Sequence, residues 1–316
     1  MTAATASVAT ARREAWRLRA RNARGFARRY ARRRDGIAGL TILLAFAVLA
    51  IAPELFVGPL QNATNGTGAS LEGPNGTHLF GTDELGRDLL NLTVHGARIS
   101  MTIGLLATLI TIVFGAVIGI VAGYVGGLAD NLLMRLTDFF LVLPTFVLAV
   151  ILAPVLLEII GTDAELLGIK ATLLVIVVVI GITSWATTAR IIRSQVLSVK
   201  ERMFVDRARV IGTGSGRIMR RDIFPNVVNL IVAQSVLTFA TAVFTETTLS
   251  FIGLGDPLQP SWGQILNQAE STGAPGLGAW WYIAPPAVCV VLVVLAFTLV
   301  GNALDDVLNP KAGQRR

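Results

Sequence analysis

The chain has 316 residues, of which 53% are hydrophobic and only 15% are charged. Soluble domains carry about 25% charged residues, so this composition argues against a soluble globular protein. The apolar residues are gathered into long blocks and the charges crowd between them. Because a bilayer core takes about 20 apolar helical residues to cross, the sequence predicts an all-α polytopic membrane protein.

Six blocks are long and apolar enough to be membrane spans. They cover Gly36–Ala52, Ile99–Gly123, Leu136–Leu157, Ala171–Thr188, Leu230–Phe251 and Tyr282–Ala303. The first block follows basic residues as a signal peptide would, but Pro53 directly after it disfavours cleavage, so we expect an uncleaved span. The chain is therefore divided into segments 1–35, 36–52, 53–98, 99–303 and 304–316: a basic N-terminal segment, the first span, an outer loop, a five-span core and a tail.

The distribution of charge predicts the orientation. Residues 1–35 carry 11 Arg against two acidic residues, and residues 190–222 carry nine basic residues against three acidic ones. The segments 53–98, 158–170 and 254–281 are all net acidic. Because short basic loops stay in the cytoplasm, we expect both termini and the 190–222 loop to face the inside of a bacterial cytoplasmic membrane.

The arginine-rich start could also indicate nucleic-acid binding. Its aromatic residues, Trp16, Phe26 and Tyr30, are too sparse to form a platform on which bases stack. A basic segment next to a span is attracted to anionic lipid headgroups by about 1 kcal/mol per charge. We therefore expect membrane lipid, and no nucleic acid, as its partner.

Small residues and prolines mark two of the spans. Gly115, Gly119 and Gly123 recur at intervals of four in the second span, which predicts a flat stripe that lets another helix approach closely. Pro144 and Pro154 in the third span are predicted kinks.

Two carboxylates fall inside predicted spans, Asp138 near the inner end of the third and Glu246 near the outer end of the fifth. A charged side chain at the bilayer centre costs about 2.5–3.5 kcal/mol on insertion scales. Either residue could face a translocation path or gate. Each could equally reach the headgroups or bond a neighbouring span, and the sequence leaves both readings open.

The cytoplasmic loop 190–226 carries the most specific pattern. Residues 201–211 contain helix formers and no Gly or Pro, and Gly212 is expected to end that helix. A second short turn from Arg217 should stop before Pro225. A short exposed helix held between two spans is suited to docking on a soluble partner.

The glycine-rich run from Gly212 to Gly216 is not a nucleotide-binding loop. It follows a predicted helix rather than a strand and lacks the Gly-Lys-Ser/Thr ending. We expect no ATP or Mg²⁺ to be bound by this chain and no catalytic residue in it. Any ATP hydrolysis would take place on another subunit.

The cytoplasmic loop resembles the "EAA" loop of ABC importer permeases. Asp206-Arg207-Ala208 stands where that family has Glu-Ala-Ala, Gly212 stands at its glycine, and Ile223-Phe224-Pro225-Asn226 stands at its Ile-Leu-Pro-Asn. Arg207 replaces the first alanine and Asp222 replaces a usual histidine. In the family this loop is the helix that couples the permease to its ATPases.

Further segments resemble the second permease of the dipeptide, oligopeptide and nickel importers. They are Phe80-Gly-Thr-Asp-Glu-Leu-Gly-Arg-Asp88, His95-Gly-Ala-Arg-Ile-Ser100, Glu246-Thr-Thr-Leu-Ser-Phe-Ile-Gly-Leu-Gly255, Pro260-Ser-Trp-Gly263 and the terminal Gly301-Asn-Ala-Leu-Asp-Asp-Val-Leu-Asn-Pro310. Asp305 stands in place of an arginine in the last of these. The motifs keep their order over nearly the whole chain after about residue 25.

The resemblance implies the type I ABC importer permease fold and a non-enzymatic transport subunit. It also implies four kinds of partner: a homologous permease, two ATPase subunits, an extracytoplasmic solute-binding protein and the substrate. Dipeptides, longer peptides, nickel chelates and haem-like ligands all occur in the family, and peptides are expected as the commonest of these.

The outer motif holds three candidate residues, Asp83, Arg87 and Asp88. We expect an ordered turn in which Arg87 pairs with a carboxylate, and contact with a binding protein or substrate is the alternative. His78 and His95 have no Cys beside them and no defined carboxylate partner in the sequence, so no metal site is expected.

Two other classes of protein were weighed. An ion-driven carrier would show internal repeats and ionisable residues near mid-membrane. An intramembrane enzyme would need paired catalytic groups inside its spans. Neither histidine falls within a predicted span, and the two intramembrane carboxylates lie toward opposite faces. The sequence therefore favours the importer.

Overall fold

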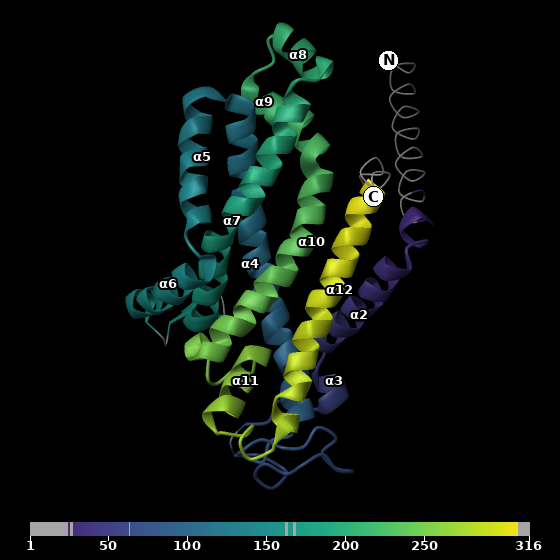
Figure 1. Ribbon diagram of the computed structural model, residues 1–316, viewed down its shortest axis with the longest axis vertical. Helices are drawn as coiled ribbons and strands as arrows, with labels where there is room; N and C mark the ends of the chain where they lie inside the picture. The colour runs from purple at the N-terminus through teal and green to yellow at the C-terminus, as the bar shows by residue number, and fades with distance from the viewer. Residues whose placement is uncertain (1–24, 26–27, 63, 162–163, 167–168, 309–316) are drawn as a thin grey trace, which may run out of the picture.

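The computed structural model describes residues 25, 28–62, 64–161, 164–166 and 169–308. Most of the basic segment 1–35 and the end of the tail 304–316 thus lie outside the described residues. The described chain is a bundle of long helices, with α8 at one end and the loop that follows α3 at the other (Figure 1).

The helices and strands follow one another in an order that matches a multi-pass membrane protein. They are α2 (Arg34–Ile51), α3 (Glu54–Val57), α4 (Leu89–Val125), α5 (Gly127–Val142), α6 (Thr145–Ile160), β1 (Glu165–Leu166), β2 (Ile169–Lys170), α7 (Ala171–Lys200), α8 (Met203–Val210), α9 (Ser215–Ile218), η1 (Met219–Ile223), α10 (Phe224–Leu249), η2 (Ser250–Leu254), α11 (Trp262–Ser271), η3 (Trp280–Tyr282) and α12 (Ala284–Leu308). Within the described residues five helices are long and apolar enough to span a membrane, or six if the bent pair α5–α6 counts as one.

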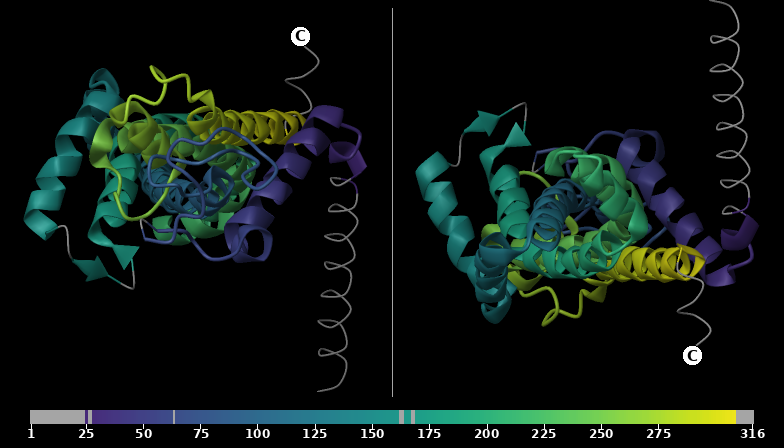
Figure 2. Two further views of the ribbon diagram at one scale, coloured as in Figure 1. Left: turned by 90° about the horizontal axis from the view of Figure 1, so that it is seen from below. Right: turned by 90° about the horizontal axis from the view of Figure 1, so that it is seen from above.

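Helix α4 is the centre of the bundle, with α7 and α10 packed along it and the pair α2–α12 to one side (Figure 2). The predicted glycine stripe makes the close approach to α7. A Cβ on Gly119 would lie 2.6 Å from the carbonyl oxygen of Ala189, and one on Gly123 would lie 2.9 Å from Val196 Cβ. The prediction of a tightly packed small-residue face on this span is therefore confirmed.

The third predicted span, Leu136–Leu157, is not a single straight helix. Helices α5 and α6 meet at 91° across a break of a few residues, and α6 lies across the bundle rather than along it (Figure 1). Pro144 supplies no backbone N–H and holds the preceding residue, Leu143, in an extended conformation (φ −74°, ψ 130°). The kink predicted at Pro144 is therefore a right-angled turn, whereas Pro154 lies inside α6.

The outer loop is shorter than the predicted 53–98, because α4 begins at Leu89. The first turns of α4, before the predicted span at Ile99, contain polar residues and therefore do not have the composition of a membrane span. Their polar side chains bond the folded loop instead: Asn91 Nδ2 donates to the Val57 carbonyl at 2.8 Å, and His95 Nε2 lies 3.0 Å from the Gly58 carbonyl. Tertiary partners thus extend the helix beyond its apolar stretch.

The expected helix stop before Pro225 is also wrong. Residues Ser215–Leu254 form one continuous helical stretch, in which the π-helical turn η1 leads directly into α10. Pro225 occupies the first turn of α10. Its missing N–H is tolerated there, next to a turn whose hydrogen bonds are already shifted from the α pattern.

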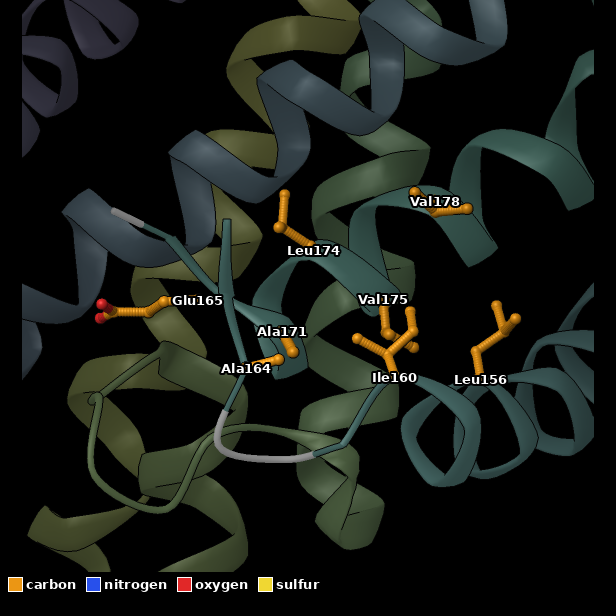
Figure 3. Close-up of a pocket in the computed structure, with 8 residues that line it drawn as sticks. All are labelled: Leu156, Ile160, Ala164, Glu165, Ala171, Leu174, Val175 and Val178. Atoms are coloured by element: carbon orange, nitrogen blue, oxygen red, sulfur yellow. The ribbon is translucent and has the colours of Figure 1, made fainter. Parts of the chain in front are cut away.

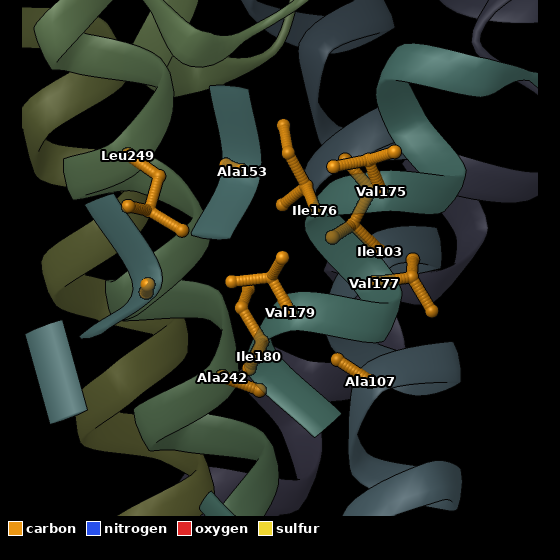
Figure 4. Packing of buried hydrophobic residues seen from close by; sticks show 11 residues of the cluster. Ile103, Ala107, Ala153, Val175, Ile176, Val177, Val179, Ile180, Ala242 and Leu249 are labelled. Carbon is orange, nitrogen blue, oxygen red and sulfur yellow. The ribbon is translucent and has the colours of Figure 1, made fainter. Parts of the chain in front are cut away.

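The largest apolar cluster lies between α4, α6, α7 and α10. Its members include Ile103, Ala107, Ala153, Val175, Ile176, Val177, Val179, Ile180, Ala242 and Leu249 (Figure 4). Outside this core the helices present apolar side chains outward, among them Leu128 at 88% and Val142 at 81% exposure. Such an outer surface suits hydrocarbon rather than water.

Candidate functional site

Helix α8 projects from the end of the bundle between two spans (Figure 1). Val205 is completely buried, whereas Met203 and Val210 are 73% and 88% exposed. The exposed side of the helix has a groove of about 380 Å³, which is lined by Met203, Asp206, Arg207, Val210 and Ile211. Helix α8 therefore has one face packed on the bundle and one apolar face with two charges open to a partner.

The buried face fixes α8 to three spans. Val205 belongs to an apolar cluster with residues of α4, α7, α9, η1 and α10, such as Val199, Ile218 and Ile223. Arg209 bonds Asp206 at 3.1 Å, and its guanidinium carbon lies 5.5 Å from the ring centre of Tyr124 in α4. Helix α8 is thus joined to the spans by direct side-chain contacts.

Gly212 ends α8, as predicted. It adopts a left-handed conformation, with φ at +82°. The amide of Thr213 donates to the Ala208 carbonyl at 3.0 Å, and the amide of Gly212 donates to the Arg209 carbonyl at 2.9 Å. This is the glycine-closed helix end in which a left-handed residue satisfies the last carbonyls.

At the opposite end of the bundle the outer loop is folded around Asp83. This carboxylate is buried and accepts from the backbone amides of Leu85 and Arg87, at 2.9 and 2.8 Å. Arg87 Nε completes the set at 2.5 Å, and its Nη2 reaches Gln268 of α11 at 3.3 Å. The predicted pairing of Arg87 with a carboxylate is therefore confirmed.

Asp88 caps α4, because its side chain accepts from the amides of Leu90 and Asn91. It also lies 3.2 Å from His78 Nδ1. Nearby, α4 is tied to the short helix α3, since Arg98 makes two hydrogen bonds to the Glu54 carboxylate, at 2.7 and 2.9 Å. These bonds lower the pKa of Glu54 below its ordinary value.

Glu246 is completely buried among the helices near the outer loop. Ser250 Oγ donates to it at 2.9 Å, and the hydroxyls of Ser100 in α4 and Ser261 at the start of α11 also face it. Those two hydroxyls accept backbone amides, from Trp262 at 3.1 Å and from Gln264 at 3.2 Å. Glu246 therefore bonds neighbouring elements, which is the second of the two readings open from the sequence.

Asp138 lies on α5 and forms an ion pair with Arg190 of α7. Elsewhere on the same two helices, Arg193 donates two hydrogen bonds to the Asp130 carboxylate, from Nε and Nη2, both at 2.6 Å. These two ion pairs hold helix α5 against helix α7. Asp138 is 57% exposed in the isolated chain, so it remains a candidate for contact with a path or a neighbouring subunit.

Comparison with known proteins assigns this arrangement to a family. The family described as "Binding-protein-dependent transport system inner membrane component" matches residues 115–314. The chain belongs to this family. The matched region includes the long spans from α5 onward, α8 and the outer end of α10.

Individual relatives extend the likeness to most of the chain. The dipeptide transport system permease protein DppC of Bacillus subtilis is 35% identical over 90% of this chain and 84% of its own length. The oligopeptide permease protein OppC of the same organism is 33% identical over 86% and 84%. The di/tripeptide permease protein DppC of Pseudomonas aeruginosa is 35% identical over 76% and 75%.

Sequence reasoning did not single out several residues that organise this permease. Asp130 lies between the second and third predicted spans and Arg193 lies in the loop after the fourth, and nothing in their spacing indicates that they meet. Trp262 is buried, and its Nε1 donates to the Thr93 carbonyl at 3.0 Å, which seats the start of α11 against α4. Only its place in the Pro260–Gly263 motif hinted at such a role.

Proposed function

We propose that this permease is one of two homologous membrane subunits that form the pathway of an ATP-driven importer of peptides. The family and the names of the relatives support import dependent on a binding protein, with peptides as the substrate class. Two ATPase subunits would hold ATP and Mg²⁺, and a solute-binding protein would deliver the peptide at the outer face.

The observation that carries this proposal is the geometry of α8. A helix that is buried on one side by Val205 and open on the other suits a soluble subunit pressing on it. Closure of the ATPases on ATP would move α8, and the shared apolar cluster would carry the movement into α4, α7 and α10. ATP then shifts the equilibrium between inward-open and outward-open states, because it binds them with different affinity.

The orientation that follows has α8 and both termini in the cytoplasm and the loop after α3 outside. The abundance of basic residues around α8 supports it, since short basic loops are retained on that side. In this orientation the N-terminal arginines lie at the inner membrane surface, where anionic lipids would attract them.

An affinity pull-down from mild detergent, followed by mass spectrometry, tests the assembly. We expect this subunit to retain a second permease and two copies of ATPase subunits. A stable homo-oligomer without any ATPase would contradict the proposal and favour an ion-driven carrier.

A further inference from the structure

A cavity of about 790 Å³ lies at the outer half of the bundle, where α6, the β1–β2 hairpin, α7 and the segment after η2 meet. It is distinct from the apolar cavity of about 450 Å³ between α6 and α7, which Figure 3 shows lined by aliphatic side chains. The larger cavity has an apolar wall, which includes Pro154, Leu157, Leu254 and Leu258. Three charged residues also line it: Glu165, Lys170 and Asp256.

One carboxylate oxygen of Asp256, Oδ2, can accept a further hydrogen bond. The residue is only 5% exposed, and its Oδ1 accepts from the amide of Leu258 at 2.9 Å. Its Oδ2 lies 3.1 Å from Lys170 Nζ. In the described chain, however, Oδ2 accepts no hydrogen bond of proper geometry. A buried carboxylate oxygen without a directed donor is costly, so a further donor at this position would be favourable.

The ammonium group of Lys170 has more N–H donors than its ion pair with Asp256 uses. Its ammonium group carries three N–H donors, and its side chain is 31% exposed. Glu165 stands opposite Lys170 in the hairpin register. Glu165 also borders the apolar cavity, and Figure 3 shows its carboxylate directed away from the aliphatic side chains there. The cavity thus combines a cation and two carboxylates with an apolar wall.

The backbone at this wall is broken in the way that substrate sites of transporters often are. Gly253 has φ +92°, a non-helical conformation within the last turn of the helical stretch Ser215–Leu254. Gly253 follows the end of the fifth predicted span, Leu230–Phe251, so this break lies at the outer end of that span. Unwound helix ends of this kind form the binding sites of several transporter folds.

Building on the proposed peptide import, we propose that this cavity is a transit site for short zwitterionic peptides. Asp256 Oδ2 receives the peptide ammonium group, and Lys170 donates to the peptide carboxylate. Each charged end of the peptide then faces the residue of opposite charge in the Lys170–Asp256 pair. The peptide side chains lie on the apolar wall. The volume lies in the range of about 300–1,000 Å³ found for small-ligand pockets, so a dipeptide or tripeptide fits.

Modified peptides test this assignment directly. The whole importer, reconstituted in proteoliposomes with its binding protein, is assayed with dialanine, N-acetyl-dialanine and dialanine amide. For each variant described below, the transport rate of a peptide is divided by the wild-type transport rate of the same peptide. This ratio cancels the selection among peptides that the binding protein makes. Binding of the three peptides to the complex without its binding protein gives a second measurement that does not depend on delivery.

Asp256→Asn is expected to slow peptides with a free ammonium group about tenfold and the N-acetylated peptide less than about twofold, as expected for loss of a charge-assisted bond. Lys170→Met is expected to slow peptides with a free carboxylate about tenfold and to spare the amide. Glu54→Gln is the matched control, because it neutralises one partner of an exposed ion pair at the same end of the bundle. It should change all three rates equally or not at all.

The outcomes separate this proposal from the proposed function. If Asp256→Asn and Lys170→Met slow all three peptides by the same factor, the pair only supports the fold and the transit site is refuted. Should either variant fail to assemble, binding of the three peptides to the wild-type complex without its binding protein decides instead, and equal affinity for all three peptides refutes the transit site. If the wild-type importer carries no peptide at all, peptide import itself is refuted.

Discussion

The sharpest test of the coupling role proposed for α8 is a substitution at the glycine that ends this helix. Gly212 has φ +82°, and a Cβ added there would meet no atom within 4 Å. The penalty of Gly212→Val is therefore conformational rather than steric. A left-handed conformation costs a non-glycine residue about 1–2 kcal/mol, and a β-branched side chain falls at the upper end or beyond.

A cost of 1–2 kcal/mol shifts the closed helix end toward an open one by a factor of about 5–30. An open end displaces Val210 and Ile211, which line the groove on the exposed side of α8. We expect the number of peptides imported per ATP hydrolysed to fall severalfold, while the complex still assembles. Transport and ATPase activity are measured together in proteoliposomes.

Gly214 provides the matched control. It also has open space around its Cβ, but its backbone is extended, with φ −63° and ψ 146°, which valine adopts readily. Gly214→Val should therefore keep wild-type coupling. If Gly212→Val also keeps it, or if both variants lose it equally, the left-handed helix end is not what makes α8 a coupling element.

Three further predictions follow from contacts elsewhere in the permease. Gly119→Leu should abolish the detergent-stable complex, because its Cβ would lie 2.6 Å from the Ala189 carbonyl oxygen; Val117→Leu, at an exposed position of the same helix, should purify normally, and equal yields of the two would contradict this packing. Glu246→Leu should lower stability by about 1–3 kcal/mol for each hydroxyl left without its acceptor, and an unchanged thermal denaturation midpoint in detergent would show that the buried serines do not depend on this carboxylate. Deletion of residues 1–24 should weaken membrane anchoring only mildly; lost transport with intact assembly would instead indicate a gating role for the arginines.

The outer loop illustrates what pattern and chemistry can predict. The expected pairing of Arg87 with a carboxylate was confirmed, with Asp83 as its partner. The signal was local, since the two residues are four positions apart and the intervening Gly86 permits a tight turn, with φ +72°. The roles of Asp83, Arg87 and Asp88 toward a binding protein stay predictions, because no partner contact decides them.

Glu246 illustrates the opposite case. Its position in an apolar block was visible in the sequence, but its environment was not. The hydroxyls of Ser100, Ser250 and Ser261 around it come from α4, η2 and the start of α11, and α4 is far from the other two along the chain. Whether a carboxylate in a span faces a path or a neighbouring helix depends on how those helices rotate and pack, and hydropathy does not encode that rotation.

The sequence alone was enough to predict the class of protein, most of its apolar spans, the helix end at Gly212 and the glycine face of α4. These depend on properties that act locally: the cost of burying charge in hydrocarbon, the length needed to cross it, and the backbone freedom of glycine. Folding of the whole chain was needed to reveal the 91° turn at Pro144, the early start of α4 and the meeting of Lys170 with Asp256. Each depends on contacts between segments distant in sequence, whose energies are comparable to the local preferences that they override.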